Sequence, residues 1–333
     1  MWWRAALYRV RRRTRALRAH LRSDLKQITV EEGFDLQDPA PHPEFPPTLD
    51  HQDVHNGPVC RAAGDSVCPL TGQLDSTAVD KSPKDILIRY HIGKKMGQGG
   101  FGAVYEGVHC KDGLKPDHPE PLPIEVALTI MANKGPSCTN IIQLLDWEEQ
   151  AEFYIMVLER PSPCEDLFDF VQRHGGRLHE GLARSVMRQA VLATDICCYC
   201  GVLHRDIKLE NLLINSDTLD VKLIDFGCRD LLRKSAYMTF IGTQQYCPPE
   251  YTAMGKYNGK PATVWLLGML LFLMVCGYYP HGTDLHMMEA KCWSKAGLSR
   301  EYSHLIQALL QREPKHRMGL EKILLHDWFK VTA

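Results

Sequence analysis

The chain lacks an apolar run long enough to span a membrane. Its longest, Val264–Cys276, has 13 residues, whereas a transmembrane helix needs roughly 20. A leader of signal-peptide form is also missing, so we expect the twelve cysteines to be reduced thiols of a cytosolic protein and not a disulfide framework. With 44% apolar and 24% charged residues, the 333-residue chain has a globular composition, and Val264–Cys276 is predicted to be a buried core helix.

The chain also lacks a strong net charge, because its formal charge is only -1. Residues 1–26, however, hold eight arginines and one lysine against one aspartate, a net of +8 that leaves -9 for the remainder. An acidic body favours basic partners or substrates. We therefore expect basic protein segments as substrates. We also expect a monomer with no nucleic-acid ligand.

The N-terminal region contains no acid in residues 1–22, where apolar residues recur at helical spacing among arginines. This pattern predicts a basic amphipathic helix with three open uses: a mitochondrial transit segment, a membrane-surface or nuclear-targeting element, or a tail without a special role. Residues 31–84 are rich in Pro, Asp, Gly and Ser, which is typical of a linker. We predict a basic segment and disordered linker over 1–85 and a folded domain over 86–330. A cytoplasmic location is expected, with a nuclear one also open.

A cluster of possible metal ligands lies in the middle of the chain: Cys197, Cys198, Cys200 and His204. Their spacing is incomplete for a four-ligand zinc site. His204 also belongs to the motif described below, so we predict that these residues hold no metal.

A glycine-rich segment opens the predicted domain, in the stretch "KKMGQGGFGAVYEGVH" at residues 94–109. The pattern G-x-G-x-x-G by itself fits a dinucleotide fold or a plain hairpin. In a dinucleotide fold the glycines lead into a helix, whereas here "AVYEGVH" continues as a second strand. The segment therefore predicts a hairpin whose loop lies over phosphates.

Two further motifs follow, "GVLHRDIKLENLLI" at 201–214 and "VKLIDFGC" at 221–228. Together with the hairpin, "GTQQYCPPE" at 242–250 and Arg317 in "PKHRMGL", they resemble the eukaryotic protein kinases over residues 90–329. The resemblance implies an α+β, bilobal kinase fold with a small β-rich upper lobe and a larger helical lower lobe. Lys208, two residues after Asp206, resembles the serine/threonine group.

The resemblance narrows to the Pim family. The segments that carry it are "QLLDWEE", "LERPSPCEDLFDFV", "GVLHRDIK", "KLIDFG" and "VCGYYP". A kinase of this family implies ATP and Mg²⁺ as cofactors and protein substrates with basic residues upstream of the Ser or Thr.

Four residues carry the chemistry by this resemblance. Asp206 would orient the substrate hydroxyl and accept its proton, Lys208 would contact the γ-phosphate, and Asn211 and Asp225 would hold Mg²⁺. Each type is common at turns or on surfaces, but the combination at these spacings favours the catalytic interpretation.

The nucleotide would be held by the hairpin and the connection between the lobes. The glycines that allow close approach of the backbone to phosphate are Gly97, Gly99, Gly100 and Gly102. The apolar residues that would sandwich adenine are Met96, Val104, Leu213 and Ile224. Glu159 can offer its carbonyl to the adenine amino group, while Pro161 has no N–H to return a second bond, as in the Pim family.

For the protein substrate, the resemblance implies an acidic patch of Asp166, Asp169 and Glu210. A plain solvated helix start is the alternative interpretation of "CEDLFDF". Leu209 replaces an acid that is usual in this patch, so the preference for arginine is expected to be weaker.

Two structural features also follow from the resemblance. Glu250 and Arg317 would form a buried ion pair in the lower lobe. Arg205, before the catalytic aspartate, marks a class of kinases in which a phosphate on the activation loop often balances the charge of this arginine. The candidate phosphorylation sites are Ser235, Tyr237 and Thr239. Pim-like kinases resemble a form that is already ordered, so no obligatory phosphorylation is expected.

The segment "VHCKDGLKPDHPEPLPIEVAL" at 108–128 departs from the family. Kinases place a V-A-x-K strand here and then a helix whose glutamate, Glu125 in this chain, pairs with that lysine. No V-A-x-K occurs, and four prolines in eight positions exclude a central strand. We therefore expect an upper lobe that lacks one strand. Candidate surrogate lysines are Lys94, Lys95, Lys111 and Lys115.

Two functions remain open from the sequence. The first is a Pim-like serine/threonine kinase, impaired or rescued by a surrogate lysine. The second is a pseudokinase or interaction module that has lost catalysis together with the lysine strand. A skipped exon or faulty gene model would leave the same gap.

Overall fold

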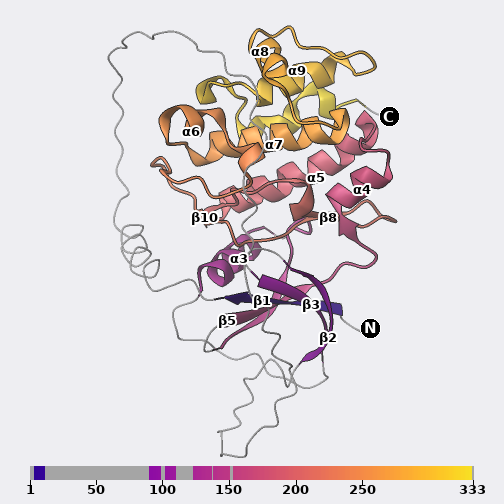
Figure 1. Ribbon diagram of the computed structural model, residues 1–333, viewed down its shortest axis with the longest axis vertical. Coiled ribbons are helices and arrows are strands. Elements are labelled where there is room, and N and C mark those ends of the chain that lie inside the picture. Colours follow the sequence, from indigo (N-terminus) through magenta and orange to yellow (C-terminus); the bar gives the residue numbers. More distant parts are fainter. Residues whose placement is uncertain are drawn as a thin grey trace, which may run out of the picture. The chain divides into compact units, whose positions relative to one another are not determined.

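The computed structural model describes residues 4–11, 90–98, 102–109, 123–136, 138–150 and 153–331. Arg4–Arg11 falls in the same compact unit as the described residues from Tyr90 onward. Figure 1 shows this unit as a sheet with one helix beside it and a larger set of helices.

The sheet has five strands, all antiparallel to their neighbours (Figure 1). Their spatial order is β2-β3-β1-β5-β4. The strands are β1 (Arg4–Arg11), β2 (Tyr90–Gln98), β3 (Gly102–His109), β4 (Leu144–Glu149) and β5 (Phe153–Glu159). Strands β2 and β3 are the predicted glycine-rich hairpin.

The expectation that the sheet lacks a strand is wrong, because β1 fills the place between β3 and β5. Tyr8, for example, pairs with Val104 on one side and Met156 on the other. The amphipathic helix predicted for residues 1–22 is also wrong over Arg4–Arg11, and its remainder lies outside the described residues. A short isolated helix is marginal in water, whereas two open strand edges supply hydrogen bonds on both sides of the segment.

Helix α3 (Ile124–Lys134) begins directly after Pro123. Proline is well tolerated at a helix start, because the N–H groups there have no partner within the helix. Val126 and Leu128 on this helix are buried. Val126 belongs to one apolar cluster with Trp147, Tyr154 and Met156 of β4 and β5. The helix therefore packs on the sheet and fixes the position of Glu125 in its first turn.

The remaining elements form the larger part of the unit. The helices are α4 (Leu167–Arg173), α5 (Glu180–Tyr199), α6 (Pro249–Met254), α7 (Gly259–Cys276), α8 (Gly282–Glu289) and α9 (Arg300–Leu309). Three short strands, β6 (Glu165–Asp166), β8 (Leu212–Ile214) and β9 (Val221–Leu223), form one sheet, and β7 (Val202–Leu203) pairs with β10 (Asp230–Leu231). The 3-10 turns are η1 (Leu209–Asn211), η2 (Gln244–Tyr246), η3 (Pro314–His316), η4 (Leu320–Leu325) and η5 (Asp327–Phe329).

Helix α7 is the core of this part, and the prediction of a buried helix over Val264–Cys276 is confirmed. By length and composition it is the one described helix that could cross a membrane, but 89% of the window is buried in the structure. At Gly268 a Cβ atom would lie 2.7 Å from Leu310 Cδ2. Glycine thus lets α7 approach the end of α9 closely.

The segment between α3 and β4 ties the sheet to the catalytic part. Ile142 N donates to Leu223 O (3.0 Å) and Leu223 N donates to Asn140 O (2.7 Å). Lys222 Nζ lies 2.9 Å from the carboxylate of Glu159, at the end of β5. These bonds fix β9, and with it the motif that follows, against the last strand of the large sheet.

Candidate active site

Asp206 is at the centre of the site, on the loop that follows β7, and only 7% of it is exposed. Its carboxylate accepts bonds from Asn211 Nδ2 (2.9 Å), Thr243 N (2.9 Å) and Thr243 Oγ1 (2.8 Å). Lys208 Nζ lies 3.3 Å from Asp206 Oδ2 and donates to Thr243 Oγ1 at 2.8 Å. A carboxylate held by this many donors has a fixed direction, which a residue that orients a hydroxyl requires.

Asn211 and Asp225 offer oxygen atoms near this carboxylate. Both bonds of the Asn211 amide nitrogen go to Asp206, to its carbonyl (2.7 Å) and its carboxylate, so Oδ1 is the amide atom left for a metal. Ile224 N donates to Asn211 O at 2.9 Å, which places Asp225 next to this turn. Asp225 Oδ1 accepts from Gly227 N (3.0 Å). An amide and a carboxylate oxygen suit Mg²⁺.

Two non-glycine residues of the site have left-handed backbones, Arg205 (φ 68°) and Asp225 (φ 59°). This conformation costs on the order of 1–3 kcal/mol at such positions and persists where the surroundings enforce it. Here the enforcing contacts are the bonds of Asp206 and Asn211 and the burial of Phe226. One of the two, Asp225, is a predicted catalytic residue, and the other directly precedes the predicted catalytic residue Asp206.

His204 is buried and holds the two motifs together. Its Nδ1 accepts from Asp206 N (3.3 Å), so Nε2 carries the proton and donates to Ile224 O (3.0 Å). The ring also meets Phe226 edge-on at 5.8 Å. Burial, and next the charge of Arg229, lower the pKa of His204 well below its usual range. His204 is therefore neutral in the folded protein.

We expect the stability of the protein to fall as the pH drops below about 6.5, where a histidine of the unfolded chain becomes protonated and the folded His204 does not. The contribution is fully present above that pH, and one such group contributes at most about 1.4 kcal/mol per pH unit. Thermal unfolding measured from pH 8 to pH 5.5 checks this.

His204→Asn should flatten this pH dependence. His316→Asn, which changes an exposed histidine, should leave it unchanged. An unchanged slope in His204→Asn would contradict the assignment.

Arg205 is balanced by a carboxylate of the chain itself. Its Nε and Nη2 donate to the carbonyls of Cys228 (2.6 Å) and Arg229 (3.0 Å), and its Nη1 lies 3.2 Å from Asp230 Oδ2. Arg233 donates to the same carboxylate at 2.9 Å. Asp230 thus supplies Arg205 with an anion, which it shares with Arg233. Sequence reasoning missed Asp230, although an acid five residues after Asp225 was the available signal.

Of the three candidate phosphorylation sites, Ser235 and Thr239 are exposed, but Tyr237 is buried. The Tyr237 hydroxyl donates to Leu231 O at 2.6 Å, and burial raises its pKa to about 12. In this structure Tyr237 is a packing residue that stacks on Tyr257.

The predicted adenine residues come from two places, the hairpin of β2 and β3 and the neighbouring strands β8 and β9. Met96 is exposed on β2, and Val104 is half-buried on β3. Leu213 on β8 and Ile224 after β9 are also half-buried, so part of each side chain stays open to contact. Gly97 and Gly102 lie in β2 and β3, while Gly99 and Gly100 fall outside the described residues.

Glu159 is the last residue of β5, and Pro161 lies two residues further along the chain. The Glu159 carboxylate accepts from Gln143 N at 2.9 Å and pairs with Lys222. Its backbone N–H donates to Gln143 O at 2.9 Å. The connection between the sheet and α4 is thus anchored at the residue predicted to face adenine.

Glu125 is buried and accepts a hydrogen bond from the Tyr154 hydroxyl at 2.5 Å. The strand that the family places opposite this glutamate is present as β1, but "RAALYRVR" contains no lysine, and its cations are Arg4, Arg9 and Arg11. Of the surrogate lysines, Lys94 and Lys95 are exposed on β2. Lys111 and Lys115 lie outside the described residues.

Arg229 is a buried cation that sequence reasoning missed. Its guanidinium contacts the Phe226 ring, and Nη2 donates to Ile224 O at 3.1 Å. Nε and Nη1 have no hydrogen-bond partner among the described residues. Burial lowers the pKa of Arg229 well below its usual range, and the charges of Asp225 and Glu125 act in the opposite direction. The site therefore contains a desolvated cation within the field of both carboxylates.

The cysteine cluster has a packing role. Burial raises the pKa of both Cys197 and Cys198 to about 12, so they stay as thiols. His204, the fourth residue of the cluster, uses both ring nitrogens for hydrogen bonds. No group of His, Cys, Asp and Glu suited to a metal occurs among the described residues.

The acids predicted to face the substrate lie on two neighbouring elements. Asp166 caps α4 by accepting from Asp169 N (2.9 Å). Burial raises the pKa of Asp166. Asp169 on α4 and Glu210 on η1 are exposed, whereas Leu209 is buried. Asp166 thus fits the helix-start interpretation, and two exposed carboxylates are left for a basic ligand.

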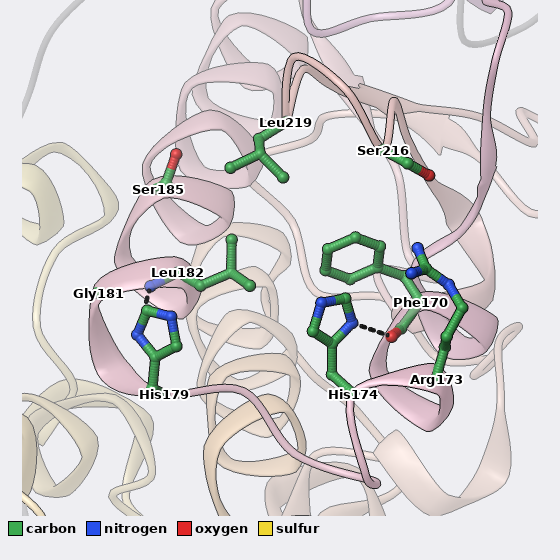
Figure 2. A pocket seen from close by; sticks show the side chains of 9 residues that line it. All are labelled: Phe170, Arg173, His174, His179, Gly181, Leu182, Ser185, Ser216 and Leu219. Atoms are coloured by element: carbon green, nitrogen blue, oxygen red, sulfur yellow. Dashed lines mark hydrogen bonds between the residues drawn. The ribbon is translucent and has the colours of Figure 1, made fainter.

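A separate pocket of about 440 Å³ lies between α4, the start of α5 and the turn before β9 (Figure 2). Figure 2 shows Phe170, Leu182 and Leu219 around the opening, with His174 and His179 at its edge. His174 Nδ1 bonds Phe170 O at 2.7 Å. None of the predicted catalytic or nucleotide residues lines this pocket.

Arg317 and Glu250 form a two-bond ion pair, with distances of 2.8 Å (Nη1–Oε1) and 2.5 Å (Nη2–Oε2). Their side chains are 1% and 2% exposed. Arg317 also donates to the carbonyls of Pro261, Gln311 and Arg312. The pair joins the start of α6 to the loop after η3.

Comparison with known proteins agrees with this geometry. A model of the protein kinase domain matches residues 90–329. The chain is 39% identical over 267 residues to the serine/threonine-protein kinase pim-2 of Danio rerio, which covers 74% of this chain and 86% of that protein. It is 35% identical over 260 residues to the serine/threonine-protein kinase prk-2 of Caenorhabditis elegans, which covers 72% of this chain and 58% of that protein.

A more distant similarity, 32% over 275 residues, links it to the PAS domain-containing serine/threonine-protein kinase of Mus musculus and covers 78% of this chain and 20% of that protein. The chain belongs to the protein kinase family, whose members transfer phosphate from ATP to proteins. Within this family it is a Pim-like serine/threonine kinase, so the prediction of its family and of the bilobal fold is confirmed. Strand β1 lies outside the range matched by the family model.

Proposed function

We propose that the chain is an active kinase that phosphorylates Ser or Thr in basic sequence contexts. The observation that carries this proposal is the network around Asp206, in which Asn211, Lys208 and Thr243 all hold one carboxylate. A chain that used the fold only as a scaffold would have no need of this arrangement. Catalysis of phosphoryl transfer consists mainly of positioning and charge neutralisation.

The residues present fit the cofactors that the family uses. Asn211 Oδ1 and the Asp225 carboxylate would hold Mg²⁺, which when bound neutralises charge on the phosphates. The hairpin of β2 and β3 would cover the phosphates, and the half-buried Val104 and Ile224 would contact the adenine. Asp206 receives the proton of the substrate hydroxyl. Lys208 donates a hydrogen bond to Thr243 and places a positive charge beside Asp206.

The pseudokinase alternative is supported by one specific observation, the absence of a lysine in β1. Against it stands the complete sheet, because the strand that orders the upper part of the site is present. The strand expected to be absent is thus present as β1, and the lysine that the family carries on it is missing from β1.

We expect a serine peptide with arginines upstream to be phosphorylated with a higher kcat/KM than the same peptide with alanines. Asp169→Asn and Glu210→Gln should each reduce this preference by a factor of about 1.4 to 5, as removal of an exposed ion pair of about 0.2–1 kcal/mol predicts. The effect should be absent with the alanine peptide. Peptide phosphorylation with radiolabelled MgATP measures both.

Asp217→Asn provides the matched control, because it removes an exposed carboxylate from the same part of the protein outside the site. Equal rates for the arginine and alanine peptides in the parent protein would overturn the basic-context proposal. Comparison of the parent protein with Asp206→Asn tests phosphate transfer itself and is independent of this preference.

A further inference from the structure

The large sheet consists of two hairpin-like pairs that are joined by one strand. β2 pairs with β3, and β4 pairs with β5. Among the described strands, the inner edges of β3 and β5 pair with β1 and with no other strand. Seven residues of β1 pair with each neighbour, from Arg4↔Val108 to Val10↔Gly102 on one side and from Ala5↔Glu159 to Arg11↔Phe153 on the other.

Without β1, both inner edges would expose rows of unpaired N–H and C=O groups. An unpaired buried backbone group costs about 1–3 kcal/mol. The two pairs would also lose their connection through the sheet, although α3 still packs on β4 and β5. The gap between β3 and β5 is therefore a slot shaped for one extended segment with hydrogen bonds on both sides.

The segment that fills this slot is attached by an unusually long connection. Residues 12–89 separate β1 from β2, whereas connections between elements of compact domains have a median of about 4–6 residues and seldom exceed about 15. The effective concentration that a tether provides falls with its length. Binding of Arg4–Arg11 in the slot thus depends on the strand's own contacts more than on the chain that connects it.

Net charge adds little to these contacts. Residues 1–26 carry a net charge of +8, but residues 27–89 carry -7 and residues 90–333 only -2. The excess of acidic residues lies in the connection between β1 and β2 and not in the part of the chain that forms the slot. Main-chain hydrogen bonds along β1, and not opposite net charges, therefore hold the segment in the slot.

We propose that the gap between β3 and β5 is a peptide-binding slot that is occupied reversibly by Arg4–Arg11, and that the same segment can bind there in trans. Occupancy completes the sheet, so release of the strand leaves the inner edges of β3 and β5 open. The mode is strand addition, in which main-chain bonds supply most of the affinity. This proposal concerns binding and does not depend on the catalytic activity.

The experiment uses the full chain with a specific protease site inserted after Gly64. After cleavage of the folded protein, residues 1–64 should elute together with the remainder in gel filtration at about 10 µM. A fluorescent peptide of residues 1–13, added in excess, should displace the fragment within hours, with a rise in anisotropy.

Two control peptides separate strand pairing from charge. A peptide with Tyr8→Pro keeps every charge but loses one N–H and disfavours pairing on two sides, and it should bind at least tenfold more weakly. A scrambled peptide of identical composition tests whether charge is sufficient. Equal binding of all three peptides would overturn the proposal.

Two further results would also overturn it. If the cleaved fragment separated at once and the remainder kept the melting temperature of the intact protein, the slot would not need the strand. If the fragment stayed bound for days without exchange in excess peptide, β1 would be a permanent strand and not a reversible ligand. A fall in melting temperature of the remainder that the 1–13 peptide reverses supports the proposal.

Discussion

Replacing Asp206 with asparagine is expected to lower the rate of phosphate transfer to a serine peptide about 10²- to 10⁴-fold, the usual contribution of a positioned general base. Asparagine has nearly the same shape, but it cannot accept the hydroxyl proton. Its amide would also face three donors, Asn211 Nδ2, Thr243 N and Thr243 Oγ1, where the carboxylate now accepts. The loss should appear in kcat, with the KM for ATP changed only a few-fold.

The same measurement decides between the two functions. Asp217→Asn makes the same change of charge at an exposed position on the same part of the protein and should keep the parent rate. Background-level transfer by both the parent and Asp206→Asn would reject the active kinase and leave the pseudokinase. Full activity in Asp206→Asn would instead show that this carboxylate is not the base.

The catalytic loop could be predicted from the sequence because its geometry is local. Asp206, Lys208 and Asn211 lie within six residues, and one turn with left-handed Arg205 brings them together. The spacing of the motif therefore already determines most of the arrangement of these three side chains. Glu250 and Arg317 are far apart in sequence, and only the family resemblance placed them together.

Strand β1 could not be predicted in this way, because its conformation depends on partners that are distant in sequence. The segment "RAALYRVR" has helical spacing of its apolar residues and no strong strand signal. What decides its structure is the pair of open edges on β3 and β5, since tertiary context overrides weak local propensity. The gap was visible in the sequence, but the segment that fills it was not.

Arg229 and Asp230 show a second kind of limit. Both follow the Asp-Phe-Gly motif directly, and neither belongs to a motif that the sequence identifies. Their roles come from contacts across the fold, with Phe226 for one and with Arg205 and Arg233 for the other. The sequence shows that both residues are charged and close to the Asp-Phe-Gly motif. Their partners depend on how the chain after this motif folds back onto the catalytic loop.

Replacing Arg317 with methionine is expected to destabilise the protein by about 3–5 kcal/mol, because Glu250 would stay buried without a partner. Three backbone carbonyls, of Pro261, Gln311 and Arg312, would lose their donor as well. At 2–4 °C per kcal/mol for a domain of this size, the melting temperature should fall by roughly 6–20 °C. Differential scanning calorimetry measures the change.

Glu250→Gln should lower the free energy of unfolding less than Arg317→Met. Arg317 keeps its three carbonyl acceptors, and the amide of the new glutamine still offers it one acceptor oxygen. The double variant should be less unstable than the sum of the single ones, because the second change removes the charge that the first left unpaired. Arg312→Met is the control: its pair with Glu289 is half exposed at 3.9 Å and contributes at most about 1 kcal/mol. Equal losses in Arg317→Met and Arg312→Met would mean that burial of the ion pair does not determine the stability of this part of the fold.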